Sequence, residues 1–390
     1  MKVLNICKFL PIKGLVSEND ITLKIYSDLK SAYNIESIFV YPCFYIPKFL
    51  SDLTTGVRRN YQIVTNKAYT DEKYNIKIRF FRSFIPLKGL YSSLEKSMWA
   101  FRIQFVFHQK DLYNLYKDYK PDIIHAHNIT DGFYAYKLYK KYGTPYIITL
   151  RGVYSYVYEK KWVTKILENA QNLSTPSYSM HGNVKKHHEI SLIPHGLDDF
   201  WFKDVVEKKV LPSKLRIVTV ARLLSLKNID IILDALNSLK NENNSFNFDI
   251  IGEGPEEERL KYLVNEYGLA SYVHFHGFLN QDDVRSVLDK NDIFILLSER
   301  ETFGRVYFEA AARNLLIIGS KGTGADGYFS SKEALFINPN KLELLEVLNS
   351  IDCEKFCRMT KLSLEKIRSF KTKIITEKYY SLFNEKVINV

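Results

Sequence analysis

The strongest constraint on the fold of this chain is a repeated alternation of short β-branched and aromatic runs with amphipathic stretches. Such alternation is typical of βα units, in which helices cover a mostly parallel sheet. In the first half the expected strands lie at residues 3–7, 36–41, 77–81, 122–125, 146–150 and 191–194. In the second half they lie at residues 215–220, 248–251, 273–276, 293–297 and 315–319. Two separate series of strands predict two sheets, and therefore two domains.

The length of 390 residues supports this division, because one hydrophobic core rarely serves more than about 250–300 residues. Charged residues and Pro212 interrupt the periodicity across residues 198–213, which predicts a linker there. We therefore expect an α/β protein with Rossmann-like domains at residues 1–197 and 214–370, each binding ligands beyond the carboxyl ends of its strands. Residues 371–390 should form a helix that packs back on the first domain through its apolar positions, Ile374, Tyr379, Leu382 and Val387.

Composition narrows the class of protein. The chain is 46% hydrophobic and 25% charged, as in ordinary globular proteins. No apolar run reaches the roughly 18 residues of a membrane span, and the apolar stretch at the start is too short for a signal peptide. We therefore expect a cytoplasmic protein. Cys353 and Cys357 are four residues apart without histidines nearby, which is not a zinc pattern and indicates reduced thiols.

The net charge of +11 comes from one half of the chain. Residues 1–200 contain 28 lysines and arginines against 17 aspartates and glutamates, a difference of 11, whereas residues 201–390 contain 27 of each. This asymmetry favours an anionic partner for the N-terminal domain, either a membrane surface or a phosphorylated acceptor. A basic face that serves only solubility is the alternative. The basic residues are dispersed and no recognition motif accompanies them, so we expect no nucleic-acid partner.

One helical pattern is a candidate for a membrane face. Leu94, Met98, Phe101 and Phe105 repeat at i, i+4, i+7 and i+11, with basic residues outside the stripe. A basic amphipathic helix of this kind can lie on an anionic leaflet, which would make the protein peripheral on the inner face of the cell membrane. The same stripe suits a helix that packs into the interior of a Rossmann-like domain at least as well.

Two cations follow the first expected strand of the second domain. In Val-Ala-Arg-Leu-Leu-Ser-Leu-Lys-Asn, Arg222 ends the strand and Lys227 stands at the start of the next helix. Fixed cations there would stabilise a departing diphosphate more in the transition state than in the ground state. Taken alone, an Arg and a Lys five residues apart are more often solvated surface charges.

Glycines follow the next two expected strands. Ile-Gly-Glu-Gly-Pro, residues 251–255, allows the backbone to approach a ligand closely, although its glycines suit a tight turn equally well. In Val-His-Phe-His-Gly-Phe, residues 273–278, Gly277 and Phe278 fall where a nucleobase could meet backbone donors and an aromatic face. The two histidines alternate with apolar neighbours, which is typical of strand residues rather than metal ligands.

The most specific feature is Glu-Thr-Phe-Gly-Arg-Val-Tyr-Phe-Glu, residues 301–309. A helix that starts near Gly304 would present free amides, which suit phosphate. Glu301 precedes this anion site, and Glu309 lies two turns further on, where its carboxylate could accept both hydroxyls of a ribose. The alternatives are a helix-dipole partner for Glu301 and an exposed helical charge for Glu309. Three alanines follow Glu309 in a face that should pack, and a buried glutamate needs a partner.

Together these segments resemble the family-4-like glycosyltransferases of the GT-B fold. Residues 301–309 match the family's E-x7-E signature, Ala-Arg-Leu-Leu-Ser-Leu-Lys its Arg and Lys, Ile-Gly-Glu-Gly-Pro its glycine turn, and His-Gly-Phe its base loop. Pro-Asp-Ile-Ile-His-Ala-His at residues 121–127 and Ser-Leu-Ile-Pro-His-Gly-Leu-Asp at residues 191–198 extend the resemblance over nearly the whole chain. Several motifs in the right order are far more specific than any one of them.

The resemblance implies a retaining, metal-independent glycosyltransferase whose two Rossmann-like domains face a central cleft. The N-terminal domain would bind a glycan or lipid-linked acceptor, and the C-terminal domain a UDP- or GDP-sugar donor, with no other cofactor. No Asp-x-Asp lies between a strand and a loop to argue for a metal. Surface polysaccharide biosynthesis, such as that of lipopolysaccharide or capsule, is the process that the family suggests.

The resemblance also assigns roles to residues. Arg222 and Lys227 would bind the donor diphosphate, Glu309 the ribose, and Glu301 would lie beside the reacting centre. His127 would approach the donor sugar, although without the motif a core histidine is an equally good interpretation. The remaining donor contacts are assigned to Gly252, Glu253, Gly277, Phe278, Phe303, Gly304 and Arg305.

Three positions of the first half depart from the family pattern. Pro-Ile-Lys-Gly replaces a double-glycine loop, so Gly14 is a candidate contact for acceptor or phosphate. Arg151 stands where a histidine is common and would contact a charged acceptor or donor carboxylate, or only stack in the cleft, and Pro-His-Gly at residues 194–196 replaces Pro-Asn-Gly. Two other functions remain open at this point. One is a sugar-nucleotide epimerase of the same architecture, against which the E-x7-E run argues. The other is a catalytically silent nucleotide-sugar-binding subunit that supports another transferase.

Overall fold

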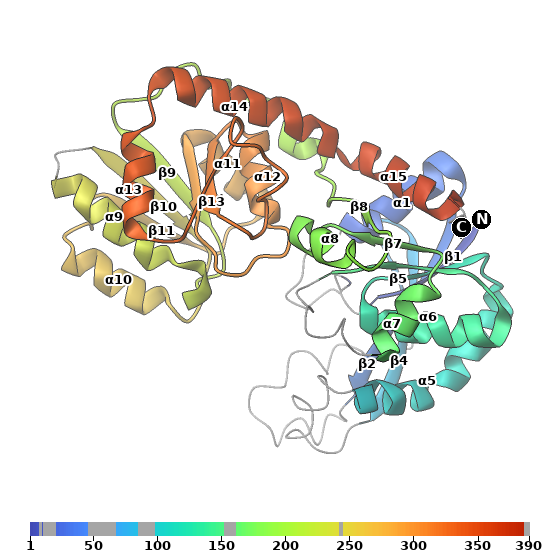
Figure 1. Cartoon of the computed structure of the whole chain (residues 1–390). Coiled ribbons are helices and arrows are strands. Elements are labelled where there is room, and N and C mark those ends of the chain that lie inside the picture. Colours follow the sequence, from blue (N-terminus) through green and yellow to red (C-terminus); the bar gives the residue numbers. More distant parts are fainter. Residues whose placement is uncertain are drawn as a thin grey trace. The chain divides into compact units, whose positions relative to one another are not determined.

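The structure, a computed structural model, describes residues 1–7, 10, 21–45, 68–84, 98–151, 161–241 and 245–385 (Figure 1). It divides into two compact units. The first contains Met1–Pro176, Met180–Ile193 and Ile375–Val390, and the second contains Ser177–Ser179 and Pro194–Ile374. The chain therefore returns to the first unit with its last helix.

The first unit is built on a sheet in the order β3-β4-β2-β1-β5-β6-β7-β8. Neighbouring strands are parallel except β3 and β4, which are antiparallel. The strand order reverses between β1 and β5, and such a switch point is where open α/β sheets bind ligands. The strands are β1 (Lys2–Ile6), β2 (Glu36–Tyr45), β3 (Ala68–Asp71), β4 (Ile76–Phe84), β5 (Ile123–Ala126), β6 (Tyr146–Thr149), β7 (Asn172–Thr175) and β8 (Ser191–Leu192).

Helices cover both faces of this sheet, because side chains of each strand alternate between the faces. Leu4 and Ile6 of β1 belong to one buried cluster and Val3 to another. The first cluster packs under α5 (Met98–Tyr119), α6 (Ile129–Tyr142), α7 (Lys161–Glu168) and α8 (Tyr178–Val184). The second packs under α1 (Ile21–Tyr33) and α15 (Thr372–Asn384). The first unit is thus a three-layer α/β/α structure.

The second unit has a parallel sheet in the order β11-β10-β9-β12-β13-β14. Numbered from β9 this is 3-2-1-4-5-6, the order of the Rossmann fold, with its switch point between β9 and β12. The strands are β9 (Leu215–Val220), β10 (Phe246–Ile251), β11 (Val273–Gly277), β12 (Ile293–Leu296), β13 (Leu316–Ser320) and β14 (Leu335–Ile337). The α-helices are α9 (Ile229–Asn241), α10 (Glu257–Glu266), α11 (Gln281–Lys290), α12 (Arg305–Ala312), α13 (Lys341–Asn349) and α14 (Cys353–Ile367).

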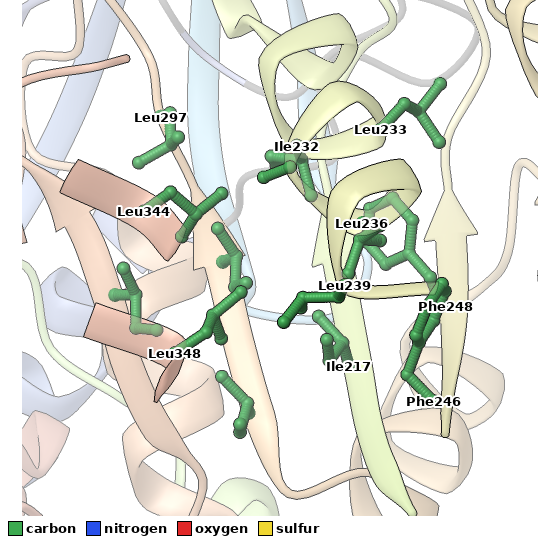
Figure 2. Close-up of a cluster of buried hydrophobic side chains, with 14 of the residues drawn as sticks. Ile217, Ile232, Leu233, Leu236, Leu239, Phe246, Phe248, Leu297, Leu344 and Leu348 are labelled. Atoms are coloured by element: carbon green, nitrogen blue, oxygen red, sulfur yellow. The ribbon is translucent and has the colours of Figure 1, made fainter. Parts of the chain in front are cut away.

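The core of the second unit lies between α9, α13 and the sheet (Figure 2). Ile232 and Leu236 repeat at i, i+4 on α9 and belong to the same buried cluster as Ile217 and Phe248 of the strands. Each such side chain stabilises the fold by roughly 1.5–3 kcal/mol when it leaves water. This packing fixes the strand ends that carry the candidate site.

The described residues of the second unit also form three short 3-10 helices, η2 (Asp199–Phe202) before β9, η3 (Ser225–Lys227) after β9 and η4 (Arg368–Phe370) after α14. Arg313, whose side chain is fully buried, holds the first of them. Its Nη1 donates to the carbonyl oxygens of Trp201 at 3.1 Å and Lys203 at 2.6 Å, and its Nε donates to Asp289 at 2.6 Å. Residues 201–204 are therefore fastened to the second unit.

Three of the described strands were not predicted from the sequence: β3, β7 and β14. Strand β7 is fully buried although Asn172, Ser174 and Thr175 are polar. Asn172 donates to the carbonyl oxygen of Leu382 at 2.8 Å, and the Ser174 hydroxyl bonds that of Thr149 at 2.8 Å. The internal hydrogen bonds allow polar residues to occupy a position that periodicity assigns to apolar ones.

Candidate functional site

The switch point of the second unit joins two loops of the chain. One loop follows β9 and includes η3, and the other follows β12 and leads to α12. The amide of Glu299 donates to the carbonyl oxygen of Leu226 at 2.9 Å, and Asn228 Nδ2 donates to the carbonyl oxygen of Leu297 at 2.9 Å. Asn228 adopts a left-handed conformation with φ of 52°, which asparagine tolerates better than most residues. The sequence did not single out Asn228, which holds the two loops together.

Lys227 and Glu301 meet between these loops. Lys227 Nζ lies 2.7 Å from Glu301 Oε2, with side-chain exposures of 13% and 23%. The second carboxylate oxygen, Glu301 Oε1, accepts a hydrogen bond from the amide of Thr302 at 3.1 Å. Arg222 is exposed and forms no ion pair with any residue that the structure describes. One cation is thus held by a carboxylate and the other remains available to an anion.

Helix α12 starts beside this pair without a side-chain cap. Its capping residue, Gly304, has φ of 69° and ψ of 56° and provides no side-chain cap. A Cβ at Gly304 would lie 2.6 Å from Tyr307 Cδ2, so a glycine is required there. The Phe303 side chain is buried and stacks on Phe308, with ring centroids 4.2 Å apart, so only the backbone of Phe303 faces the site. An uncapped helix start is suited to a phosphate group.

Glu309 and Arg305 form an ion pair within α12. Arg305 Nε lies 2.8 Å from Glu309 Oε1, with side-chain exposures of 22% and 12%. Burial raises the pKa of the Glu309 carboxyl above its ordinary value, and Arg305 partly opposes that rise. The buried glutamate therefore has a partner, and it is one of the residues that the sequence assigned to the ligand.

The glycine turn after β10 packs against the loop after β9. A Cβ at Gly252 would lie 1.9 Å from the carbonyl oxygen of Ala221, and one at Gly254 would lie 2.1 Å from that of Leu223. The amide of Leu223 also donates to the carbonyl oxygen of Glu253 at 2.9 Å. Of the two interpretations that the sequence left open, these contacts favour the tight turn, which places the loop carrying Arg222.

The loop after β11 meets the same turn. Glu253 Oε1 accepts a hydrogen bond from the amide of Phe278 at 3.2 Å, and the Phe278 side chain is 66% exposed. Gly277 has φ of 64°, a left-handed conformation that favours glycine. His276 Nε2 lies 2.8 Å from Asp249 Oδ1, which gives that strand histidine a partner within the sheet. An aromatic face and a carboxylate thus lie together where the sequence expected a nucleobase.

A loop that the sequence did not single out covers Glu301. It follows β13, and the amide of Gly324 donates to the carbonyl oxygen of Glu301 at 3.0 Å. A Cβ at Gly324, where φ is 53°, would lie 3.0 Å from Glu301 Cγ. The sequence contained one indication of this loop, because glycines at 322, 324 and 327 follow the strand predicted at residues 315–319.

In the first unit, His127 lies at the switch point between β1 and β5. Its amide donates to the carbonyl oxygen of Ile6 at 3.0 Å, and its Nε2 lies 3.0 Å from Asn5 Oδ1. An amide oxygen only accepts, so Nε2 carries the proton and Nδ1 is left as an acceptor. That Nδ1 is buried and has no hydrogen-bond partner among the described residues. Burial, and then His125 and Arg151, hold the pKa of His127 well below its ordinary value, so the ring is neutral at pH 7.

Buried polar side chains surround His127. His125 contacts the Tyr26 hydroxyl through Nδ1, and its Nε2 lies 2.7 Å from the Thr149 hydroxyl. Arg151, at the end of β6, donates to the Thr22 hydroxyl at 2.9 Å. Gly14, the other candidate of this unit, lies outside the described residues. The two units therefore each gather their described candidates at the carboxyl ends of their own strands.

Comparisons with known proteins agree with this architecture. The family model described as "Glycosyl transferases group 1" matches residues 203–352, and "Glycosyltransferase Family 4" matches residues 80–199. The chain is 25% identical over 186 residues to the putative colanic acid biosynthesis glycosyltransferase WcaL of Escherichia coli strain K12. That match covers 45% of this chain and 46% of WcaL, so the chain spans about half the length of this relative.

Solved structures resemble the whole chain. The lipopolysaccharide outer core galactosyltransferase WaaB, in its apo form, has a TM-score of 0.73 and 17% identity, covering 98% of this chain and 99% of that one. Anabaena HepE in complex with UDP and glucose has a TM-score of 0.65 and 16% identity, covering 98% and 99%. At this identity the likeness establishes the fold, which is the two-domain GT-B architecture.

Proposed function

Because this chain belongs to the glycosyl transferases of group 1, with a family 4 region in its first half, we propose that it is itself a glycosyltransferase. It would move a sugar from a nucleotide-sugar donor to a glycan or lipid-linked acceptor. The observation that carries the proposal is the switch point of the second unit, where Arg222, the Lys227–Glu301 pair and the open start of α12 come together. Two cations and an uncapped helix start are suited to a diphosphate.

The proposed reaction retains the anomeric configuration and uses no metal ion. The bond between the sugar C1 and the diphosphate oxygen breaks, the acceptor oxygen bonds C1 from the same face, and its proton passes to the leaving phosphate. Arg222, Lys227 and the first amides of α12 would stabilise the negative charge that develops on the phosphate. In the donor-free protein Glu301 holds Lys227 at 2.7 Å, which keeps the ammonium in place for the diphosphate.

The other residues would position the donor. Glu309, held by Arg305, would accept the ribose hydroxyls, and Glu253 with Phe278 would meet the base of a UDP- or GDP-sugar. His127 Nδ1 would accept a hydrogen bond from a hydroxyl of the sugar, since its neutral ring offers an acceptor there. Support for a nucleotide-sugar donor comes from the fold shared with HepE, which was solved with UDP and glucose.

We propose surface polysaccharide biosynthesis as the process. The support is the similarity to WcaL and to WaaB, whose names concern colanic acid and the lipopolysaccharide outer core. Such acceptors are assembled at membranes, so the protein would act in the cytoplasm and at the inner face of the cell membrane. Among the helices of the described residues, none combines the length and hydropathy that crossing a bilayer requires.

The test is sugar transfer from a panel of UDP- and GDP-sugars, with and without lipid-linked and glycan acceptors. The Lys227→Ala variant should lose about 10²–10³-fold in turnover, the usual loss on removing one group that stabilises transition-state charge. The Lys261→Ala variant is the control, because Lys261 pairs with Glu257 and Glu258 on α10. Normal turnover in Lys227→Ala would contradict the diphosphate site. Conversion of a donor to its epimer, or donor binding without turnover under any condition, would favour one of the two alternative functions.

A further inference from the structure

A groove on the helical face of the first unit lies outside the candidate site. It is formed by α5, α6 and α7 and has a volume of about 470 Å3. Its described lining residues combine aromatic and aliphatic side chains with basic ones and include no carboxylate: Arg102, Phe105, Val106, Gln109, Phe133, Tyr136, Lys137, Trp162, Lys165 and Ile166. No step of the proposed reaction uses these residues.

The three cations of the groove have no counter-charge among the described residues. Arg102, Lys137 and Lys165 form no ion pair with a residue of the described part of the chain. Lys137 Nζ lies 5.4 Å from the ring centroid of Phe133 and 6.0 Å from that of Phe105, which holds the ammonium over the aromatic floor. Cations gathered without counter-charges favour an anionic occupant.

Trp162 adds an indole ring to the lining of the groove. Its Nε1 is buried, so the ring is an apolar part of the lining and not a donor to an occupant.

The exposed side of α5 continues the groove. Arg102, Val106 and Gln109 follow one another at i, i+4 and i+7, which places them on one stripe of the helix. Val106 is 60% exposed and the adjacent Phe107 is 59% exposed. Phe105, in contrast, is buried against Phe133 and Tyr134. The sequence left two interpretations of the apolar stripe that includes Phe105, a membrane face or a helix face packed into the domain interior. The burial of Phe105 supports the interior, and a different stripe of α5 faces solvent.

We propose that this groove is where the first unit docks on a bilayer, by seating the phosphate and upper acyl chain of one anionic phospholipid. The phosphate would lie among Arg102, Lys137 and Lys165, while the chain would lie on Phe133, Trp162 and Ile166. Among the described residues of the lining, Gln109 and Tyr136 are the uncharged groups that can bond an occupant, and sugars need many more hydrogen bonds, so a membrane surface fits better than a glycan. Exposed apolar residues beside cations are typical of helices at anionic interfaces.

The first experiment is flotation of the full chain with phosphatidylcholine vesicles that contain or lack phosphatidylglycerol, at low and high salt. The wild type should float only with the anionic vesicles. Lys137→Glu/Lys165→Glu should reduce partition by more than about tenfold, since each basic residue near the surface strengthens binding. Lys30→Glu/Lys185→Glu changes the net charge equally at exposed positions off the groove and should partition nearly as the wild type does. If both double variants lost vesicle partition equally, binding would depend on the net charge of the protein and not on this groove, and the proposal would be wrong.

The second experiment uses tryptophan fluorescence with lipids brominated near the headgroup. The chain contains three tryptophans, Trp99, Trp162 and Trp201, so the protein used is Trp99→Phe/Trp201→Phe, in which Trp162 is the remaining fluorophore. The anionic vesicles should quench its fluorescence. Absence of quenching while this variant still floats with the vesicles would overturn the assignment to this groove. Inorganic phosphate at constant ionic strength should not release the protein from the vesicles. Release would show a free-anion site in place of a lipid site. None of these measurements requires transferase activity, so they remain informative if the proposed function fails.

Discussion

His125 and His127 make the stability of the first unit depend on pH. Both side chains are fully buried, and burial lowers the pKa of each well below its ordinary value. As the pH falls through the ordinary histidine pKa, about 6.5, the unfolded chain gains protons that the folded chain does not. The free energy of unfolding should therefore be fully retained above pH 6.5 and decrease below it. Each histidine contributes up to about 1.4 kcal/mol per pH unit.

The prediction is tested by urea denaturation between pH 7.5 and pH 5. The His127→Asn variant keeps a polar group beside Asn5 but removes one of the two titrations, so its free energy of unfolding should fall less steeply with acid. His274→Asn is the control, because His274 is exposed on β11 and its loss should leave the slope unchanged. A slope in His127→Asn equal to that of the wild type would show that His127 is protonated in the folded protein.

At the same scale, the residues of the candidate site differ in how far the sequence could predict them. Lys227 and Glu301 were both expected near a diphosphate, but their 2.7 Å contact joins positions 74 residues apart and no local pattern encodes it. The same holds for Glu253, which accepts from the amide of Phe278, and for Gly324, which covers Glu301. A sequence indicates which chemistry a residue can perform. Its partners follow from strand order, which only the folded sheet establishes.

At the scale of elements, the last helix is fastened to the first unit by a small set of contacts. Ile375, Tyr379, Leu382 and Phe383 of α15 are buried against the sheet, where Tyr379 lies 5.9 Å from the ring of His125. Tyr379→Ala should lower the free energy of unfolding of the first unit by about 3–5 kcal/mol, the usual cost of removing a buried aromatic ring. Chemical denaturation monitored by circular dichroism would measure the change.

The neighbouring Tyr380→Ala variant is a matched control on the same helix. Tyr380 is 36% exposed and stacks on Tyr33 with ring centroids 3.9 Å apart. Its loss should therefore lower the free energy of unfolding by about 0.5–1.5 kcal/mol, the usual contribution of an aromatic pair. If the two variants were equally stable, α15 would not be bound through its buried stripe.

Elements with clear periodicity were predicted well, and those held by polar contacts were not. Strands β1, β9 and β12 were expected within one residue of their bounds because their runs are rich in β-branched and other aliphatic residues. Strand β7 was missed because hydrogen bonds, rather than apolar contacts, satisfy its interior side chains. The sequence predicted that Ile374 of the last helix packs on the first domain, but the fully buried residue is Ile375. Which residues of a short helix face the core depends on the residue at which the helix begins. Val387 lies outside the described residues.

At the scale of the whole molecule, the two units hold candidate residues for different parts of the proposed reaction. The donor candidates Arg222, Lys227, Glu301 and Glu309 all belong to the second unit, whereas His127 belongs to the first. The excess of 11 basic residues also lies within residues 1–200. A soluble nucleotide should therefore bind the second unit without contacting the first. An anionic membrane surface should instead bind the first unit.

Hydrogen exchange of the full chain with and without UDP or GDP tests this division. A nucleotide at about 100 times its Kd stabilises its site by about 2.7 kcal/mol. We therefore expect slower exchange in residues 222–228 and 301–309, and unchanged exchange in α6. Glu309→Gln should weaken this protection, because the ribose loses its charged acceptor, whereas Glu354→Gln on the exposed side of α14 should not. Protection confined to residues 123–128, with none at 301–309, would place the nucleotide on the first unit and contradict the assignment of the donor site.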